Sequence, residues 1–584
     1  MPRTPPEPAA PADSFTGGAP AAPRAADRLL LGALRHSAGR GLALALVAAA
    51  STGAALALPA VLGHTLDLLL GRHGTGAGPW VALCAGLVCL AAVFDAVDEL
   101  LSATTTARST AWLRHRALRH VLAAGPRLGD RFAPGDLVAR LVGGTERAGA
   151  APAGLAGTVA AVAGPVGGIV ALGLVDPWLA AVFLAGAPLL VLLLRAFARA
   201  SSDSLTAYQR LQGDIAGRLL EALGGARTIA AAGTAGRERA RILAPLPALS
   251  RHGHRVWQVQ GRSTAQAATL VPLLQIAVLA VGGLRLAQHH LTVGDLLAAS
   301  RYAVLATGVG VLVGQLGTLV HSRTAARRLA DVTTVPPVRY GTRTLPPDGP
   351  GTLELHGVTV TLDGRPVLCD VSLRVPGGTT LAVVGRSGSG KSLLAAVAGR
   401  LTDPDTGDVT LDGVPLRDLT HDALRRAVGH AFARPALLGG TIAGTLALGV
   451  DAPPPAALTA AARAARADDF VLRLPAGYAT PCADAPLSGG ERQRLGLARA
   501  FAHAGRLLVL DDATSSLDSV TEHHVRQALV RDVAARTRLI VAHRATTAAA
   551  ADRVAWLEDG RVRAVGTHER LWRHHPGYRA VFAG

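Results

Sequence analysis

The chain has 584 residues, a length that predicts two or more folded units rather than one core. Hydrophobic residues make up 49% of it, which is high for a soluble protein and indicates segments in lipid. The formal net charge of +18 is compatible with nucleic acid or a membrane surface, but aromatics are only 3% of the chain and form no basic–aromatic stripe for stacking bases, which disfavours nucleic acid.

Residues 1–28 are rich in Pro and Ala and lack the apolar stretch of a signal peptide, so we predict a disordered tail. Residues 29–330 contain six apolar runs with almost no internal charge, which predict an all-α six-helix transmembrane domain. The second and fifth runs are short and, taken alone, also fit buried helices of a soluble bundle. The six runs lie near Gly41–Gly63, Pro79–Phe94, Ala151–Val175, Pro177–Leu194, Ala267–Leu284 and Val304–Val320.

Arginines are concentrated in two long stretches between these runs, at 108–147 and 210–239. The positive-inside rule places both stretches, and with them both termini, in the cytoplasm. Their helical spacing predicts that the membrane helices continue beyond the bilayer. We therefore expect a multi-pass protein of the cell membrane, surrounded by lipid.

Residues 331–350 are rich in Pro, Thr and Gly and are predicted to be a linker. Across 351–584, short β-branched runs alternate with helical segments, which is typical of an α/β domain with a central sheet. Its motif "GRSGSGKS" follows an apolar strand and precedes a helix, the context of a phosphate-binding loop, and contains the only lysine of the chain. The residues expected to bind ATP are Gly385, Arg386, Ser387, Gly388, Ser389, Gly390, Lys391 and Ser392.

A second apolar strand, "RLLVLDD", ends in Asp511 and Asp512. A carboxylate at the end of a buried strand, downstream of a phosphate loop, commonly organises Mg²⁺. We therefore expect Ser392 and Asp511 to be the metal ligands.

Further motifs follow the order of one known family. "LSGGERQR" lies at Leu487–Arg494, before the second strand, and "SSLD" and "VAHR" follow that strand. Together with the phosphate loop they resemble the complete motif series of an ATP-binding cassette (ABC) ATPase. "FAPGDLVARL" at Phe132–Leu141 and "LTVGDLLA" at Leu291–Ala298 extend the resemblance to exporter-type half-transporters.

The resemblance implies an α/β P-loop ABC ATPase domain that binds ATP and Mg²⁺ and works as one half of a dimer. Each ATP is then held by the phosphate loop of one chain and the signature of the other. Asp512 and His543 take the catalytic positions, and Asp518 couples the two sites. The signature residues expected to touch the partner's ATP are Ser488, Gly489, Gly490 and Glu491.

Three positions depart from the family pattern. Asp512 stands where the family has a glutamate that polarises the attacking water, and its carboxylate is one methylene shorter. Ala433 takes the place of a glutamine that contacts Mg²⁺, and Leu362 that of an aromatic residue that stacks on adenine. The departures are either drift within an active ATPase or the mark of a weak ATP site. The second interpretation favours a heterodimer, with a partner half-transporter that carries the missing groups, over a homodimer.

The expected function is ATP-driven transport, with the chain hydrolysing ATP and exporting a hydrophobic or amphipathic small molecule or peptide. Import of a metal chelate by the same fold is an alternative. A second alternative is a regulatory subunit that binds ATP without hydrolysing it. A DNA-associated ABC ATPase is disfavoured by the six apolar runs, and no nucleic-acid partner is expected.

Overall fold

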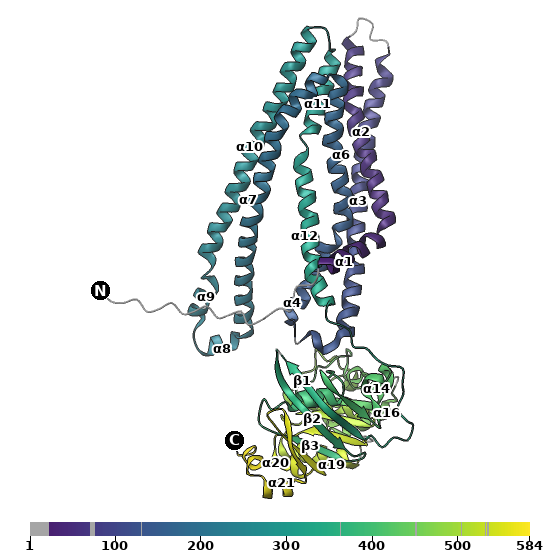
Figure 1. Cartoon of the computed structure of the whole chain (residues 1–584), viewed down its shortest axis with the longest axis vertical. Helices are drawn as coiled ribbons and strands as arrows, with labels where there is room; N and C mark the ends of the chain where they lie inside the picture. Colours follow the sequence, from purple (N-terminus) through teal and green to yellow (C-terminus); the bar gives the residue numbers. More distant parts are fainter. Residues whose placement is uncertain are drawn as a thin grey trace, which may run out of the picture. The chain divides into compact units, whose positions relative to one another are not determined.

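The computed structural model describes residues 23–70, 76–129, 131–362, 364–449, 453–503, 505–531, 533 and 536–583. The chain divides into two compact units, one within Met1–Leu122 and Arg131–Pro336 and the other within Ala123–Asp130 and Pro337–Gly584. Figure 1 traces both units along the chain.

The first unit is helical. Long helices pack along one another, α7 on α10, and α6 on both α2 and α12 (Figure 1). The helices introduced here are α1 (Pro23–His36), α2 (Ala38–Leu70), α3 (Ala77–Ala124), α4 (Pro134–Ala139), α5 (Thr145–Gly149), α6 (Ala151–Val175), α7 (Pro177–Gly224), α8 (Ala226–Ala231), α9 (Ala235–Leu243), α10 (Leu246–Ala287), α11 (Val293–Ala306) and α12 (Val309–Thr333).

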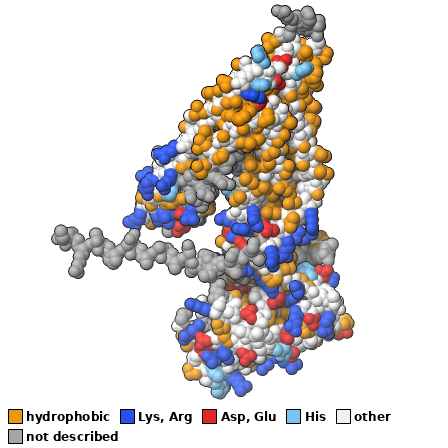
Figure 2. Space-filling model, turned by 45° about the horizontal axis from the view of Figure 1, so that its top comes forward, with side chains coloured by type: hydrophobic (Ala, Val, Ile, Leu, Met, Phe, Trp, Pro, Cys, Tyr) orange, Lys and Arg blue, Asp and Glu red, His pale blue; other side chains and the backbone are white. Residues whose placement is uncertain are grey.

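By length and composition, four helical stretches among the described residues could cross a membrane: Ala38–Leu70, Ala77–Leu128, Pro134–Val175 and Ala268–Ala287. Large apolar side chains point outward from them; Leu174, for example, is 83% exposed. Figure 2 shows hydrophobic side chains over much of the visible face of the helical unit, with basic side chains gathered at its α8–α9 end. An apolar exterior of this kind is stable in lipid rather than water.

The helix bounds refine the sequence predictions. The fourth predicted run opens α7, which continues to Gly224, and α3 likewise continues far beyond Phe94, so the predicted helical extensions are confirmed. The sixth predicted run, Val304–Val320, is wrong as one continuous helix because α11 ends at Ala306 and α12 begins at Val309. The Thr307 hydroxyl donates to the Val304 carbonyl at 2.7 Å, a local bond that favours a helix end.

The start of the chain also differs from the predicted tail. Residues 23–28 belong to α1, because Ala26 is fully buried in a cluster with Leu329 of α12. Residues 1–22 lie outside the described residues. At the other end of the unit, α12 extends to Thr333, three residues into the predicted linker 331–350.

Contacts within the helical unit explain the motif "LTVGDLLA". Thr292 and Asp295 form a capping box at the start of α11, and Asp67 of α2 accepts hydrogen bonds from the Thr292 hydroxyl at 2.6 Å and the Gly294 N–H at 2.7 Å. A Cβ atom at Gly294 would lie 2.0 Å from the Gly63 carbonyl oxygen, so this crossing of α2 and α11 requires glycine.

The motif "FAPGDLVARL" is held by one arginine. The Arg140 guanidinium pairs with Asp136 at 2.8 Å and Asp331 at 3.1 Å, and it lies 4.9 Å from the centre of the Phe132 ring. These contacts fasten α4 to the end of α12.

The second unit is an α/β domain with two sheets. The larger sheet has the order β10-β9-β3-β8-β7-β6, in which β6, β7, β8, β3 and β9 run parallel and β10 is antiparallel. The smaller, antiparallel sheet has the order β2-β1-β4-β5. The strands are β1 (Leu353–Leu362), β2 (Arg365–Val375), β3 (Thr380–Val384), β4 (Thr406–Leu411), β5 (Val414–Pro415), β6 (Val428–Phe432), β7 (Leu507–Asp511), β8 (Thr537–Val541), β9 (Arg553–Glu558) and β10 (Arg561–Gly566).

Helices cover the sheets and position the site. One apolar core lies between the two sheets and includes α13, and a second lies among α15, α16, α18 and β7. The helices are α13 (Lys391–Ala398), α14 (His421–Ala427), α15 (Ile442–Leu446), α16 (Pro455–Ala464), α17 (Asp468–Val471), α18 (Gly489–Ala502), α19 (Ser519–Arg531), α20 (Ala545–Ala549), α21 (His568–His574) and α22 (Pro576–Ala580).

Candidate functional site

The carboxyl ends of four neighbouring parallel strands form one edge of the larger sheet. The phosphate loop follows β3, Ala433 follows β6, Asp511 ends β7 with Asp512 directly after it, and His543 follows β8. Ligands of open parallel sheets bind outside this edge. The topology therefore brings together side chains that are far apart in the sequence.

The phosphate loop needs glycine at defined points. Gly388 and Gly390 have φ angles of 81° and 97°, a region that other residues avoid. A Cβ atom at Gly385 would lie 2.2 Å from the Leu557 carbonyl oxygen. The strand β3 thus passes directly into a tight loop that presents backbone N–H groups at the start of α13, a suitable cradle for an anion.

Lys391 lies over this loop. Its ammonium group donates to the carbonyl oxygens of Gly385 at 2.8 Å and Arg386 at 2.9 Å, and only 6% of the residue is exposed. Burial lowers the pKa of Lys391, while the nearby carboxylates of Asp512 and Asp511 oppose this shift. The side chain is a concentrated positive charge beside the loop.

Two oxygen donors meet at the end of β7. The Ser392 hydroxyl donates to Asp511 at 2.8 Å. Burial raises the pKa of Asp511, and the hydrogen bond from Ser392 partly offsets the effect. A hydroxyl and a carboxylate in contact are oxygen ligands of the kind Mg²⁺ prefers, so the pair fits the metal predicted from the sequence.

Asp512 and His543 face each other across the site. The Asp512 carboxylate lies 4.0 Å from His543 Nε2, and both side chains are partly exposed. Asp512 also has a φ angle of +52°, the left-handed conformation that Asp adopts more readily than most side chains.

The signature residues cap a helix. Ser488 and Glu491 form a reciprocal capping box at the start of α18, and the hydrogen bond from the Ser488 N–H is the main reason the pKa of Glu491 is lowered. Gly489 and Gly490 open the helix on the protein surface. Asp518 lies at the start of α19, where backbone N–H groups lower its pKa. Ser488, Gly489 and Asp518 are exposed within the single chain, and Gly490 and Glu491 are partly exposed.

Two of the three departing positions, Leu362 and Ala433, lie at the ends of strands. Leu362 ends β1 and is 40% exposed. Ala433 immediately follows β6, and its carbonyl accepts a hydrogen bond from Gln493 at 3.2 Å. Neither side chain offers a polar atom to the site.

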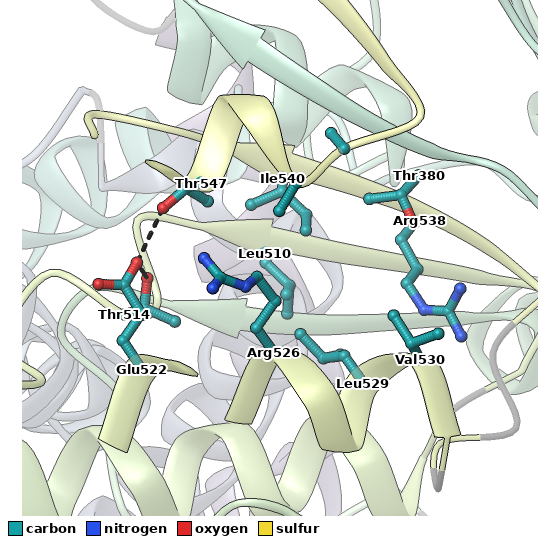
Figure 3. Close-up of a pocket in the computed structure, with 12 residues that line it drawn as sticks. Thr380, Leu510, Thr514, Glu522, Arg526, Leu529, Val530, Arg538, Ile540 and Thr547 are labelled. Atoms are coloured by element: carbon teal, nitrogen blue, oxygen red, sulfur yellow. Dashed lines mark hydrogen bonds between the residues drawn. The ribbon is translucent and has the colours of Figure 1, made fainter. Parts of the chain in front are cut away.

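Sequence reasoning missed Gln493 and Glu522, two buried polar residues beside the site. Glu522 accepts hydrogen bonds from Thr547 at 2.8 Å and Thr514 at 3.4 Å, and it forms an ion pair with Arg544. Figure 3 shows Thr514, Glu522 and Thr547 together at one end of a cavity of about 40 Å³. A glutamate in the first turn of a helix just after "SSLD" was the available signal.

Comparisons with known proteins agree with this architecture. Residues 42–308 match the family model of the ABC transporter transmembrane region, and residues 368–515 match that of the ABC transporter. The ABC transporter ATP-binding protein RamA of Streptomyces coelicolor is 56% identical over 90% of this chain and 82% of its own length.

Two further similarities cover different shares of the chain. The multidrug efflux ATP-binding/permease protein Rv0194 of Mycobacterium tuberculosis is 38% identical over 62% of this chain and 30% of its own length. The solved structure of a bacterial Atm1-family ABC exporter with ATP bound has a TM-score of 0.80 and 24% identity, and the match covers 94% of this chain and 98% of that one. The last comparison supports the fold.

Proposed function

Because this chain belongs to the ABC transporter family, whose ATPase domain couples ATP hydrolysis to transport, we propose that it exports a hydrophobic or amphipathic small molecule or peptide. The chain is an integral membrane protein that binds ATP, and half-transporters of this family dimerise. The single observation that carries the proposal is the joining, in one chain, of an apolar helical unit and an ATPase unit with a phosphate loop and a signature motif. Similarity to a multidrug efflux protein supports the outward direction.

In this proposal the phosphate loop from Gly385 to Ser392 holds the ATP phosphates. Lys391 neutralises part of their charge, and Ser392 with Asp511 would hold Mg²⁺, which would supply further positive charge to the phosphates. Asp512 accepts the proton of the attacking water, and His543 contacts the γ-phosphate. The contact between the Ser392 hydroxyl and Asp511 at 2.8 Å supports the metal assignment.

The signature of this chain completes the ATP site of its partner. Ser488, Gly489 and Gly490 supply a hydroxyl and backbone N–H groups at the start of α18, where the helix dipole favours an anion. Glu491 holds this turn in shape through its capping box with Ser488. Asp518 contributes to the contact between the two chains.

We further propose that the ATP site of this chain is catalytically weak and that its partner is a different half-transporter. Asp512 has a shorter reach than the family's glutamate, Ala433 offers no side-chain ligand, and Leu362 packs on the base without aromatic stacking. The signature is intact, so the chain can complete a competent site on its partner.

The orientation in the membrane is a further part of the proposal. By the positive-inside rule, the ATPase unit and both arginine-rich stretches lie in the cytoplasm.

Transport into inverted membrane vesicles tests export directly. Vesicles containing the assembled transporter should accumulate a labelled amphipathic substrate when ATP is added, and Lys391→Met vesicles should not. ATP-dependent loss of preloaded substrate from the same vesicles would instead establish import and contradict the proposal.

A regulatory subunit that binds ATP without hydrolysing it is the second candidate, favoured by the three departing positions. In that case Asp512→Ala would leave the ATPase rate of the assembled complex unchanged, while removal of the partner's glutamate would abolish it. Loss of activity in Asp512→Ala alone would reject the regulatory interpretation.

A further inference from the structure

A buried glutamine connects two loops of the nucleotide site. Gln493 belongs to α18, which carries the signature residues at its start, and it is 1% exposed. Its Nε2 lies 3.2 Å from the carbonyl oxygens of Ala433 and Asp512 and 3.2 Å from the Ser515 hydroxyl. Its Oε1 accepts the Ser516 N–H at 2.9 Å. One side chain therefore contacts the loops after β6 and β7.

The Asp512 backbone is fixed by several hydrogen bonds. Its carbonyl accepts from Gln493, from the Ser515 hydroxyl at 3.0 Å and from the Ser515 N–H at 3.3 Å. This restraint matters because Asp512 holds a left-handed φ of +52°, which a non-glycine residue keeps only when its surroundings enforce it. The direction of the Asp512 carboxylate depends on that backbone conformation.

We propose that Gln493 is a positioning residue that sets the Asp512 carboxylate relative to the signature helix. The inference rests on the proposed function of Asp512 and of the signature. Because α18 carries both Ser488 and Gln493, a movement of its first turn against the partner's ATP shifts the carboxamide that holds Asp512. The two ATP sites of the dimer are thereby linked through one side chain.

A purely structural role is the alternative, since a buried carboxamide with all its hydrogen bonds made also stabilises packing. Removal of the carboxamide distinguishes the two roles. Loss of packing lowers the number of folded, ATP-binding molecules, whereas loss of positioning lowers the turnover of each molecule that still binds ATP. Loss of positioning also has no effect once the Asp512 carboxylate is gone.

The test uses the full chain in lipid, assembled with a partner half-transporter whose own catalytic glutamate is replaced by glutamine, so that the remaining turnover comes from the Asp512 site. The variant is Gln493→Met, which keeps the side-chain length and removes the hydrogen bonds. We expect kcat per titrated ATP site to fall at least tenfold, with the KM for ATP within about twofold of wild type. In an Asp512→Asn background, Gln493→Met should cause no further loss. Gln527→Met is the matched control, because Gln527 is exposed and contacts only His523 among the hydrogen bonds of the described residues.

If Gln493→Met does not fold, the milder variant Ser515→Ala tests the same inference. It removes one donor to the Asp512 carbonyl from an exposed residue, and it should lower kcat several-fold, again only when Asp512 is present. Three results would overturn the inference. The first is a fall in kcat together with the number of ATP sites, and the second is an unchanged kcat. The third is a fall in kcat in the Asp512→Asn background as large as the fall in wild type. Absence of transport by the wild-type assembly would instead count against the proposed function alone.

Discussion

Replacing Asp512 by glutamate adds the methylene that the family carries at this position. The Asp512 carboxylate lies 4.0 Å from His543, and the longer side chain would advance it by about 1 Å toward a water beside the γ-phosphate. A displacement of that size is worth up to about 100-fold in rate, or about 2.7 kcal/mol of activation free energy. We therefore expect Asp512→Glu to raise ATP turnover at this site by roughly 10- to 100-fold.

The same substitution should not stabilise the protein. Asp512 has a φ angle of +52°, and glutamate tolerates the left-handed conformation less well than aspartate, at a cost on the order of 1 kcal/mol. The assay is steady-state phosphate release in lipid by the chain assembled with a partner half-transporter whose own catalytic glutamate is replaced by glutamine, so that turnover comes from the Asp512 site. Thermal unfolding is measured for each variant, and Asp512→Asn is the matched variant without a base. An Asp512→Glu protein that binds ATP but hydrolyses it no faster than wild type would refute the reasoning.

Three further predictions concern the ATPase unit. Lys391→Met removes the buried ammonium group of the phosphate loop, so ATP binding measured by calorimetry should weaken at least tenfold; unchanged affinity would reject the assigned loop. Burial lowers the pKa of His430 to about 4 from 6.5, so the folded state resists protonation and its stability should fall by up to about 3 kcal/mol as the pH drops from 6.5 to 4. Thermal unfolding of His430→Phe should not show this loss of stability between pH 6.5 and 4. A variant that loses as much stability as wild type over this range would contradict the role given to His430. Arg127 pairs with Asp403 within the ATPase unit, and because the pair is partly exposed, Arg127→Ala should lower the free energy of unfolding by no more than about 1 kcal/mol; a much larger loss in denaturant unfolding would contradict this.

Local signals in the sequence predicted the parts of the structure that depend on local chemistry. The phosphate loop was predictable because its glycines, its lysine and the preceding apolar strand are consecutive. The apolar runs predicted the long helices because lipid demands continuous apolar surface. The break at Thr307–Gly308 was missed because hydropathy does not register a hydroxyl that bonds its own helix.

Gln493 and Glu522 were missed for a different reason. Gln493 contacts Ala433, which is 60 positions away in the sequence, and Glu522 pairs with Arg544 on another loop. Such contacts arise only when the sheet brings the ends of β6, β7 and β8 to one edge. A polar residue within an amphipathic helix gives no sign, in sequence alone, of whether it faces water or a buried carbonyl.

The weak ATP site and the different partner chain are tested most directly by one comparison of rates. ATP turnover should be measured for the purified chain alone in lipid and for the chain co-expressed with a second ABC half-transporter of the same organism. The account predicts negligible turnover alone and robust, substrate-stimulated turnover together. Full turnover by the chain alone would contradict it, and would mean that Asp512 suffices as the base in a homodimeric transporter.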